Sequence, residues 1–534
     1  MLHPELHQLT SAALLAFAML AGANGKDQDD LLTVAERSDY TETATYADVM
    51  TLCAQLNQRA DHIHLASLGT THEGRDIPLV IIANPPIATP EQARESGKLI
   101  LFAFGNIHAG EVCGKEALMI LARELALDPD HDLLDDIIFL IAPIYNADGN
   151  ERFAPVAENR PGQNGPTRVG QRHNAQDFDL NRDYIKLDAP ETRGLVKLLT
   201  EWDPHITIDT HTTNGSYHRY TLTFDAPTNP SGPTEPIEYV RDTLLPEVSA
   251  RLLERAGYDT FFYGDFNRDH TAWVTYSAQP RFGGPCQGLR GQMSILSEAY
   301  SYAPFKDRVL CTLEFIREIA MYASENHHQI IDIHNRARAD TIARGENAQP
   351  DDTIGIRHTI AAHPRLVTVK GWEYEDDPPR SRRPQPTDQA EDYSVVHLGR
   401  FEATRSVSRP WAYLIQPGND DIVELLLLHG VVAEPFTGSA SAQVYTIDEI
   451  DIAPQNFQGR RTRLLEATAH DATSAFAGAT LIRTAQPLGN LVVYLLEPES
   501  EDGFAAWDLF GDRIQQGGAY PILRIAQPQD IAPD

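Results

Sequence analysis

Short apolar runs alternate with longer segments of helical spacing between residues 45 and 338, and this alternation limits the folds open to the chain. The runs KLILFAF, DIIFLIA and HITIDT are largely apolar, which is typical of strands covered on both faces of a sheet. Strands are expected at 98–104, 136–142, 205–210 and 292–297, with two more around the turn THEGRD within 62–84. Helices are expected at 45–59, 112–127, 188–202, 237–256 and 306–338. This order of elements predicts an α/β fold with a mixed sheet flanked by helices.

After about residue 340 the alternation of strands and helices gives way to loops and short β-rich runs. Two charged, loop-like stretches, GENAQPDD and DDPPRSRRPQPTDQAED, lie among short β-rich runs. These runs are PRLVTVKGW, RPWAYLI, AQVYTI, NLVVYLL and YPILRI. A chain of 534 residues has room for two or three domains. We therefore expect an α/β domain over 24–340 and a smaller, mainly β C-terminal domain over 341–534.

The N-terminal segment 11–23, SAALLAFAMLAGA, is a short apolar run that precedes the polar stretch KDQDD. It has the pattern of a secretory signal peptide cleaved near Ala23, and it is too short to span a bilayer. The ten residues before it contain no Lys or Arg, so a buried or frayed N-terminal helix is the alternative. The pattern predicts a secreted or periplasmic protein with no membrane span in the mature chain.

The charge balance and the cysteines exclude other classes of protein. The chain has 44 Lys and Arg against 76 Asp and Glu, a net charge of −32. Nucleic-acid binding requires clustered cations that neutralise phosphates, and no such run occurs, so no nucleic-acid partner is expected. The four cysteines lie far apart in the chain, which argues against a disulfide framework and against a CxxC metal site.

A candidate metal site follows the strand expected at 98–104. His108 and Glu111 form an H-x-x-E motif in the turn between this strand and the next helix. The motif is weak alone, but His211 stands at the carboxyl end of another expected strand, the edge at which α/β sheets build their sites. Two His and one Glu with an open fourth position are typical ligands of a catalytic zinc. We therefore predict that His108, Glu111 and His211 bind one Zn²⁺ ion.

Further motifs surround these ligands in a definite order. NADGN (146–150) follows an expected strand, DLNR (179–182) precedes a helix, and Ser297-Glu298 ends a late strand. Together with HAGE and TH, these motifs resemble the zinc metallocarboxypeptidases of the carboxypeptidase A type over about residues 45–335. The resemblance implies a central mixed sheet of eight strands flanked by helices, with zinc at the carboxyl edge of the sheet.

The resemblance also implies a role for each matching residue. Asp179 would orient His108 by a hydrogen bond with the ring nitrogen that does not bind the metal. Asn181 and Arg182 would bind the free C-terminal carboxylate of a peptide substrate, for which the planar guanidinium is well suited. Glu298 would be the general base that takes a proton from the attacking water and delivers it to the leaving amine.

Two roles, those of the oxyanion Arg and of the mobile Tyr, match the family pattern less well, and the role of Arg281 stays open. Arg160 is the best match for the Arg that steadies the developing oxyanion. Its rivals are Arg152, Arg168 and Arg172. Tyr276 is nearest to the position of the mobile Tyr that covers the substrate, although its surroundings depart from the pattern. Arg281 either favours an acidic C-terminal residue or pairs with a surface carboxylate.

The sequence therefore predicts a zinc metallocarboxypeptidase that removes C-terminal residues from peptides. A zinc acylamino-acid deacylase similar to succinylglutamate desuccinylase would share the H-x-x-E, Asn-Arg and later His motifs, but the export signal and the long extra domain argue against it. Cell-wall peptides are a third substrate group. A non-catalytic peptide-binding module is least expected, because neither a zinc ligand nor the general base is missing. The sequence leaves the oligomeric state open.

Overall fold

The computed structural model describes residues 31–213, 215–375 and 385–529. The segment 11–23 lies outside the described residues, so the signal peptide stays a prediction. Among the described helices, none is long and apolar enough to cross a membrane.

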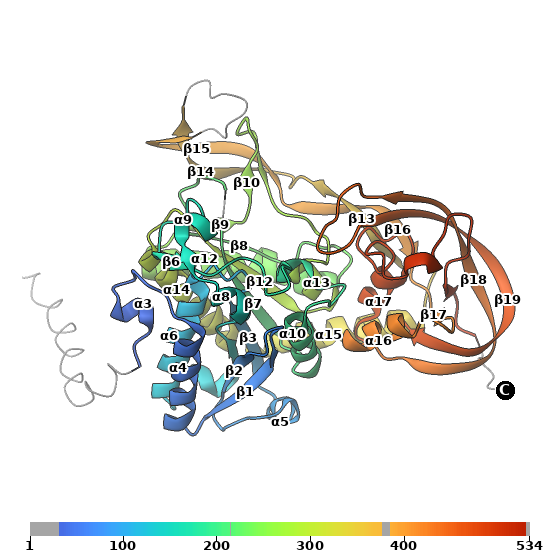
Figure 1. The fold of residues 1–534 in the computed structure, drawn as a ribbon, viewed down its shortest axis with the longest axis horizontal. Helices are drawn as coiled ribbons and strands as arrows, with labels where there is room; N and C mark the ends of the chain where they lie inside the picture. The colour runs from blue at the N-terminus through green and yellow to red at the C-terminus, as the bar shows by residue number, and fades with distance from the viewer. Residues whose placement is uncertain (1–30, 214, 376–384, 530–534) are drawn as a thin grey trace, which may run out of the picture.

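An eight-stranded mixed sheet forms the centre of the region from residue 31 to about 350, which confirms the predicted fold class (Figure 1). The strand order is β1-β2-β4-β3-β7-β12-β8-β9. The strands are β1 (Ile63–Thr70), β2 (Asp76–Ile82), β3 (Leu99–Gly105), β4 (Ile137–Ala142), β7 (Ile206–Thr212), β8 (Leu222–Asp225), β9 (Thr260–Phe262) and β12 (Met293–Ala299). Because β4, β3, β7 and β12 are parallel to one another, their carboxyl ends meet at one edge of the sheet.

Strand β3 shows why the central strands are apolar throughout. Leu99 and Leu101 belong to a core on one face of the sheet, and Ile100 and Phe102 belong to a second core on the other face. Successive side chains of a strand point to opposite faces, so a strand covered on both sides is apolar at every position. The first face is covered by α4 (Tyr46–Arg59), α6 (Cys113–Leu127), α12 (Leu245–Ala256) and α14 (Phe305–Glu325). The second is covered by α5 (Pro90–Ser96) and α10 (Pro190–Glu201).

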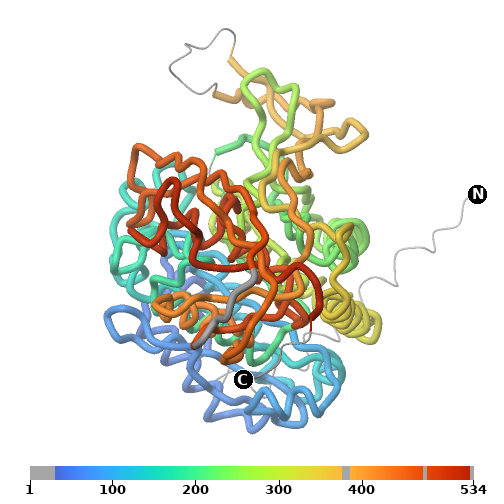
Figure 2. The backbone as a smooth tube through the Cα atoms, turned by 90° about the vertical axis from the view of Figure 1, so that its right-hand side faces the viewer, coloured from blue at the N-terminus to red at the C-terminus, as the bar shows by residue number. Residues whose placement is uncertain are grey.

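The chain after α15 (His327–Glu346) is rich in strands and lies beside the sheet, as Figures 1 and 2 show. Four of its strands close on themselves in the order β17-β19-β18-β20. These are β17 (Ala412–Ile415), β18 (Glu434–Ile452), β19 (Arg463–Arg483) and β20 (Ile522–Ile525). A separate antiparallel pair is formed by β13 (Thr353–Ala361) and β16 (Arg400–Ser408).

One small sheet combines strands from both parts of the chain, in the order β10-β11-β15-β14, and protrudes at the top of Figure 1. Its strands are β10 (Asp265–Phe266), β11 (Ala272–Val274), β14 (Leu366–Tyr374) and β15 (Pro386–Leu398). The two regions expected as separate domains are therefore joined by shared backbone hydrogen bonding.

The remaining elements are short. The helices are α3 (Val34–Arg37), α7 (Leu133–Asp136), α8 (Ala147–Asn150), α9 (Val156–Asn159), η1 (Leu180–Arg182), α11 (Thr234–Tyr239), η2 (Val240–Leu244), α13 (Gly283–Leu289), α16 (Asp420–Leu428), α17 (Gly489–Leu496) and η3 (Gly511–Arg513). A two-stranded sheet is formed by β5 (Ala154–Pro155) and β6 (Arg168–Val169).

Two sequence expectations about these elements are wrong. The single helix expected over 306–338 is the pair α14 and α15, which meet at Asn326. The Asn326 amide donates to the carbonyl oxygen of Tyr322 at 2.8 Å, and such local bonds compete with the helical backbone. The run NLVVYLL, expected as a strand, is helix α17, and all its residues are buried. A short continuous apolar run does not distinguish strand from helix by periodicity.

Candidate metal centre and active site

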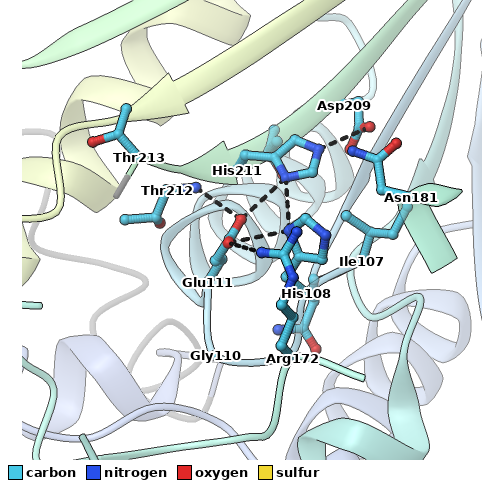
Figure 3. Close-up of polar contacts among 12 residues, drawn as sticks. Ile107, His108, Gly110, Glu111, Arg172, Asn181, Asp209, His211, Thr212 and Thr213 are labelled. Carbon is cyan, nitrogen blue, oxygen red and sulfur yellow. Dashed lines mark hydrogen bonds and ion pairs between the residues drawn. The ribbon is translucent and has the colours of Figure 1, made fainter. Parts of the chain in front are cut away.

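The three predicted zinc ligands meet at the carboxyl edge of the sheet (Figure 3). His108 and Glu111 lie in the turn between β3 and α6, and His211 lies near the end of β7. Their potential ligand atoms all lie within 4.8 Å of one another. Nδ1 of His211 is 3.2 Å from Nδ1 of His108 and 3.0 Å from Oε2 of Glu111. The three side chains are buried, so the sheet edge holds them together out of contact with bulk water.

Each imidazole contacts a carboxylate through its Nε2 atom, which faces away from the ligand cluster. Nε2 of His108 lies 3.0 Å from Oδ1 of Asp179, and Nε2 of His211 lies 2.9 Å from Oδ2 of Asp209. A proton on each Nε2 leaves both Nδ1 lone pairs facing Glu111, and this carboxylate-His arrangement is the one that binds zinc in proteins. Two imidazole nitrogens and one carboxylate oxygen also fit the ligand preference of Zn²⁺. The donor set therefore fits a zinc ion.

Asp209 was not recognised in the sequence. It lies two residues before His211 on β7, so both side chains point to the same face of the strand. The period of two along an expected strand is the signal that identifies such a residue. It also explains the spacing D-T-H at the end of this strand.

Replacing Asp209 by Asn should weaken zinc binding about 10- to 100-fold, the usual effect of losing the partner of a ligand His. The amide is neutral and holds the His211 proton less strongly. Competition with a chromogenic chelator measures the affinity. Asp225→Asn is the control, because Asp225 is also buried but accepts from Thr275 rather than from a ligand. An unchanged affinity in Asp209→Asn would contradict this role.

Glu298 faces the ligand cluster from the neighbouring strand. The parallel pairing of β12 with β7 aligns Glu298 with His211. Its Oε2 atom is buried without a hydrogen-bond partner. Burial raises the pKa of Glu298 to about 8; Glu111 and Asp209 act in the same direction, and His211 and Arg160 oppose them. The structure thus places a carboxyl group with one unpartnered oxygen beside the candidate metal site.

Asn181 and Arg182 lie on the other wall of the same cavity. The cavity has a volume of about 130 Å³ and is also lined by the three candidate ligands and Glu298. Oδ1 of Asn181 accepts from the backbone N–H of Gly283 at 2.9 Å, which leaves its NH₂ group as a donor. The Arg182 guanidinium stacks on the Phe282 ring at 3.9 Å. Both side chains are held in place by the segment that begins α13.

Asp179 connects this wall to the metal site. Its Oδ2 atom accepts from Nε and NH2 of Arg172 at 3.0 and 2.9 Å, while its Oδ1 atom contacts His108. Burial alone would raise the pKa of Asp179, but His108, Arg172 and Arg182 hold it well below its ordinary value. Asp179, which contacts Nε2 of His108, is therefore an ionised carboxylate.

The structure distinguishes Arg160 from Arg172, one of its rivals for the role of the oxyanion Arg. Arg160, which is 8% exposed, directs NH1 to Glu111 and NH2 to the carbonyl oxygens of Thr212 and Thr213. Its guanidinium supports Glu111 and does not line the cavity. Arg172 lines the cavity, and 29% of its side chain is exposed. The resemblance ranks Arg160 first because it follows the N-x-D-G motif, but both residues lie in irregular segments whose path the sequence does not determine.

Two tyrosines line the cavity. Tyr276, the residue expected from spacing, lies against Tyr263 with ring centroids 5.8 Å apart and against Phe282 at 5.5 Å. Tyr263 follows β9 and was not singled out in the sequence, where no motif marks it. Burial raises the pKa of both phenols, so they stay protonated and able to donate.

Arg281 does not line the cavity, contrary to the pocket role considered for it. Its Nε and NH2 atoms lie 2.8 and 2.7 Å from Oδ1 of Asp502, a buried residue of the C-terminal region. The alternative prediction paired Arg281 with a surface carboxylate. Its partner is indeed a carboxylate, but that carboxylate is buried. Asp502 lies 221 residues away in the chain, and no sequence signal connects the two.

Comparisons with known proteins agree with this geometry. Residues 49–218 match the family model described as zinc carboxypeptidase. The chain is 24% identical over 489 residues to carboxypeptidase 2 of Trichophyton equinum, covering 85% of this chain and 81% of the relative. It is 31% identical over 162 residues to human carboxypeptidase Z, covering 28% of this chain and 23% of the relative.

Two solved structures are also similar. Carboxypeptidase A from Helicoverpa armigera aligns with a TM-score of 0.40 at 15% identity, covering 57% of this chain and 81% of that one. A metallo-carboxypeptidase from Burkholderia cenocepacia aligns with a TM-score of 0.37 at 16% identity, covering 52% and 69%. The matched family model and the fungal relatives thus support a likeness of this chain to zinc carboxypeptidases of the carboxypeptidase A type.

Proposed function

We propose that this peptidase is a zinc-dependent metallocarboxypeptidase that removes single residues from the free C-termini of peptides. One observation carries the proposal: a single cavity is lined on one wall by His108, Glu111 and His211, and on another by Asn181 and Arg182. A hydrolytic site that shares its cavity with carboxylate-binding groups is suited to cleaving a bond next to a chain end.

Asn181 and Arg182 would bind the terminal carboxylate. The guanidinium presents parallel N–H donors that match a carboxylate, and the free NH₂ group of Asn181 adds a further donor. Phe282 and Gly283 hold both side chains before substrate arrives, so little conformational entropy is lost on binding. These contacts would select free C-termini over internal peptide bonds.

Zinc bound by His108, Glu111 and His211 would polarise the scissile carbonyl and make water more acidic. Glu298 would then act as general base towards the attacking water and as general acid towards the leaving amine. Its buried Oε2 atom without a partner is available to accept that proton. Arg172 would donate to the oxyanion that develops on the scissile carbonyl, and we assign it this role in place of Arg160 because it lines the cavity.

Replacing Arg172 by Met should lower kcat about 10²- to 10³-fold with a smaller change in KM, as for other oxyanion donors. Steady-state kinetics measure both values, and metal analysis shows whether zinc is retained. Arg152→Met is the control, since Arg152 pairs with Glu73 at the surface. A normal kcat in Arg172→Met with full zinc content would contradict the assignment.

The proposed activity is tested by mass spectrometry of a peptide pool before and after incubation with the zinc-loaded protein. Peptides with free carboxyl ends should lose one residue at a time from that end, and the same peptides as C-terminal amides should stay intact. Cleavage of internal bonds, or equal cleavage of amides, would contradict the proposal. If no peptide is trimmed, acylamino acids and cell-wall peptides are the substrates to test next.

A further inference from the structure

The C-terminal region reaches the active site through three contacts that are far apart in sequence. Helix α17 packs against α13, as Figure 1 shows. The loop 453–462 between β18 and β19 lies against the segment that carries Asp179, and Asp502 binds Arg281. These contacts reach Asp179, which precedes Asn181 by two residues, and the segment 281–289, whose Phe282 and Gly283 contact Arg182 and Asn181.

In the contact between Arg281 and Asp502 the carboxylate is buried, and both of its oxygens accept hydrogen bonds. Asp502 is 0% exposed and accepts from the backbone N–H of Arg281 at 2.7 Å and from Trp507 at 2.9 Å. The guanidinium also lies 4.8 Å from the Trp507 ring and 5.3 Å from the Phe457 ring. The carboxylate and the two aromatic rings fix the position of the Arg281 side chain. Because Asp502 also binds the backbone N–H of Arg281, the path of the backbone at residue 281 is fixed as well.

That backbone path sets the next two residues, which touch the carboxylate-binding pair. Phe282 stacks on the Arg182 guanidinium, and the Gly283 N–H donates to Asn181. Gly283 also packs closely against Tyr184, since a Cβ atom at this position would lie only 2.9 Å from the ring. A displacement at residue 281 is therefore transmitted to the two groups that recognise the substrate.

The loop 453–462 supports the same wall from the other side. Oε1 of Gln458 accepts from the backbone N–H of Asp179 at 2.8 Å. Arg460 pairs with Asp188 at 2.8 Å. The segment between Asp179 and Asp188 contains Asn181 and Arg182, so the loop holds both ends of this segment.

We propose that the C-terminal region holds the substrate site in its binding geometry, and that Arg281 and Asp502 are positioning residues for the carboxylate-binding pair. The inference rests on the proposed function, because it requires Asn181 and Arg182 to bind a terminal carboxylate. The buried ion pair acts through Phe282 and Gly283. It affects the binding of free C-termini and leaves the metal site unchanged.

Asp502→Asn tests the proposal in a Glu298→Gln background, which prevents turnover of the ligand. Calorimetry with the zinc-loaded full chain compares the peptide that wild type trims best with its C-terminal amide. We expect affinity for the carboxylate peptide to fall about tenfold, with unchanged affinity for the amide and unchanged zinc content. In an otherwise wild-type chain, KM should rise by a similar factor with little change in kcat.

Asp352→Asn is the matched control, since Asp352 pairs with the buried Arg409 in the C-terminal region away from the cavity. It should lower the melting temperature without changing the preference for the carboxylate. Gln458→Ala removes one hydrogen bond from a surface loop and should lower carboxylate affinity about threefold even if Asp502→Asn folds poorly.

The outcomes separate the inference from the proposed function. A preference for carboxylate over amide that survives both Asp502→Asn and Gln458→Ala, or that falls equally in Asp352→Asn, would overturn the positioning role alone. A parent protein that binds the carboxylate and amide peptides equally would overturn the proposed function, and the inference with it.

Discussion

Glu298→Gln should lower kcat on the order of 10³-fold while zinc content and KM stay close to wild type. Gln has nearly the same size and hydrogen-bonding reach as Glu, but it does not accept the proton that the attacking water has to lose. The variant should also be about as stable as wild type, because Gln has nearly the same shape and the buried Oε2 atom of Glu298 has no hydrogen-bond partner to lose.

Steady-state kinetics, metal analysis and thermal unfolding measure these effects. Glu318→Gln is the control: Glu318 is also buried, but it lies on α14 and pairs with Arg255. Turnover of Glu298→Gln within tenfold of wild type, with zinc bound, would show that another group moves the proton.

Loss of the metal is the second large effect that we expect. Chelation should abolish peptide trimming, and added Zn²⁺ should restore it. His211→Ala should reduce zinc from about one ion per chain to a small fraction, because only two of the three protein ligands remain. The chain should stay folded in both cases, since Arg160 and Arg172 still pair with Glu111.

Metal analysis after dialysis, isothermal calorimetry with Zn²⁺ and circular dichroism measure stoichiometry, affinity and fold. The control is His205→Gln, because His205 precedes β7 at the opposite end of the strand and accepts from the backbone of Ile100. Trimming by the chelated protein, or wild-type zinc affinity in His211→Ala, would contradict the zinc assignment.

Much of the site could be predicted because its residues stand at strand ends. His211 and Glu298 each lie near the end of an apolar strand, and the parallel pairing of those strands brings the two side chains together. Asp209 follows from the same periodicity, since it lies two residues before His211 on one face of β7.

Other parts of the site depend on irregular segments. Arg160 and Arg172 lie in loops around α9 and β6, where no periodicity relates sequence to direction. Hydrogen bonds with Glu111 and with the carbonyl oxygens of Thr212 and Thr213 draw Arg160 behind the metal site, and Asp179 holds Arg172 at the cavity. Tyr263 likewise lies in a connection without a motif.

The sequence by itself determined the α/β class with its mixed sheet and placed the candidate zinc ligands at strand ends, because apolar runs form strands and polar motifs at their ends share one edge. The number of eight strands and the roles of Asn181, Arg182 and Glu298 came from the resemblance to zinc carboxypeptidases. Only the tertiary structure decided that Arg172 lines the cavity, that NLVVYLL is a helix and that Asp502 binds Arg281. These facts depend on contacts between distant segments, because packing and burial, rather than local propensity, select the partner of a charge and the form of a short apolar run.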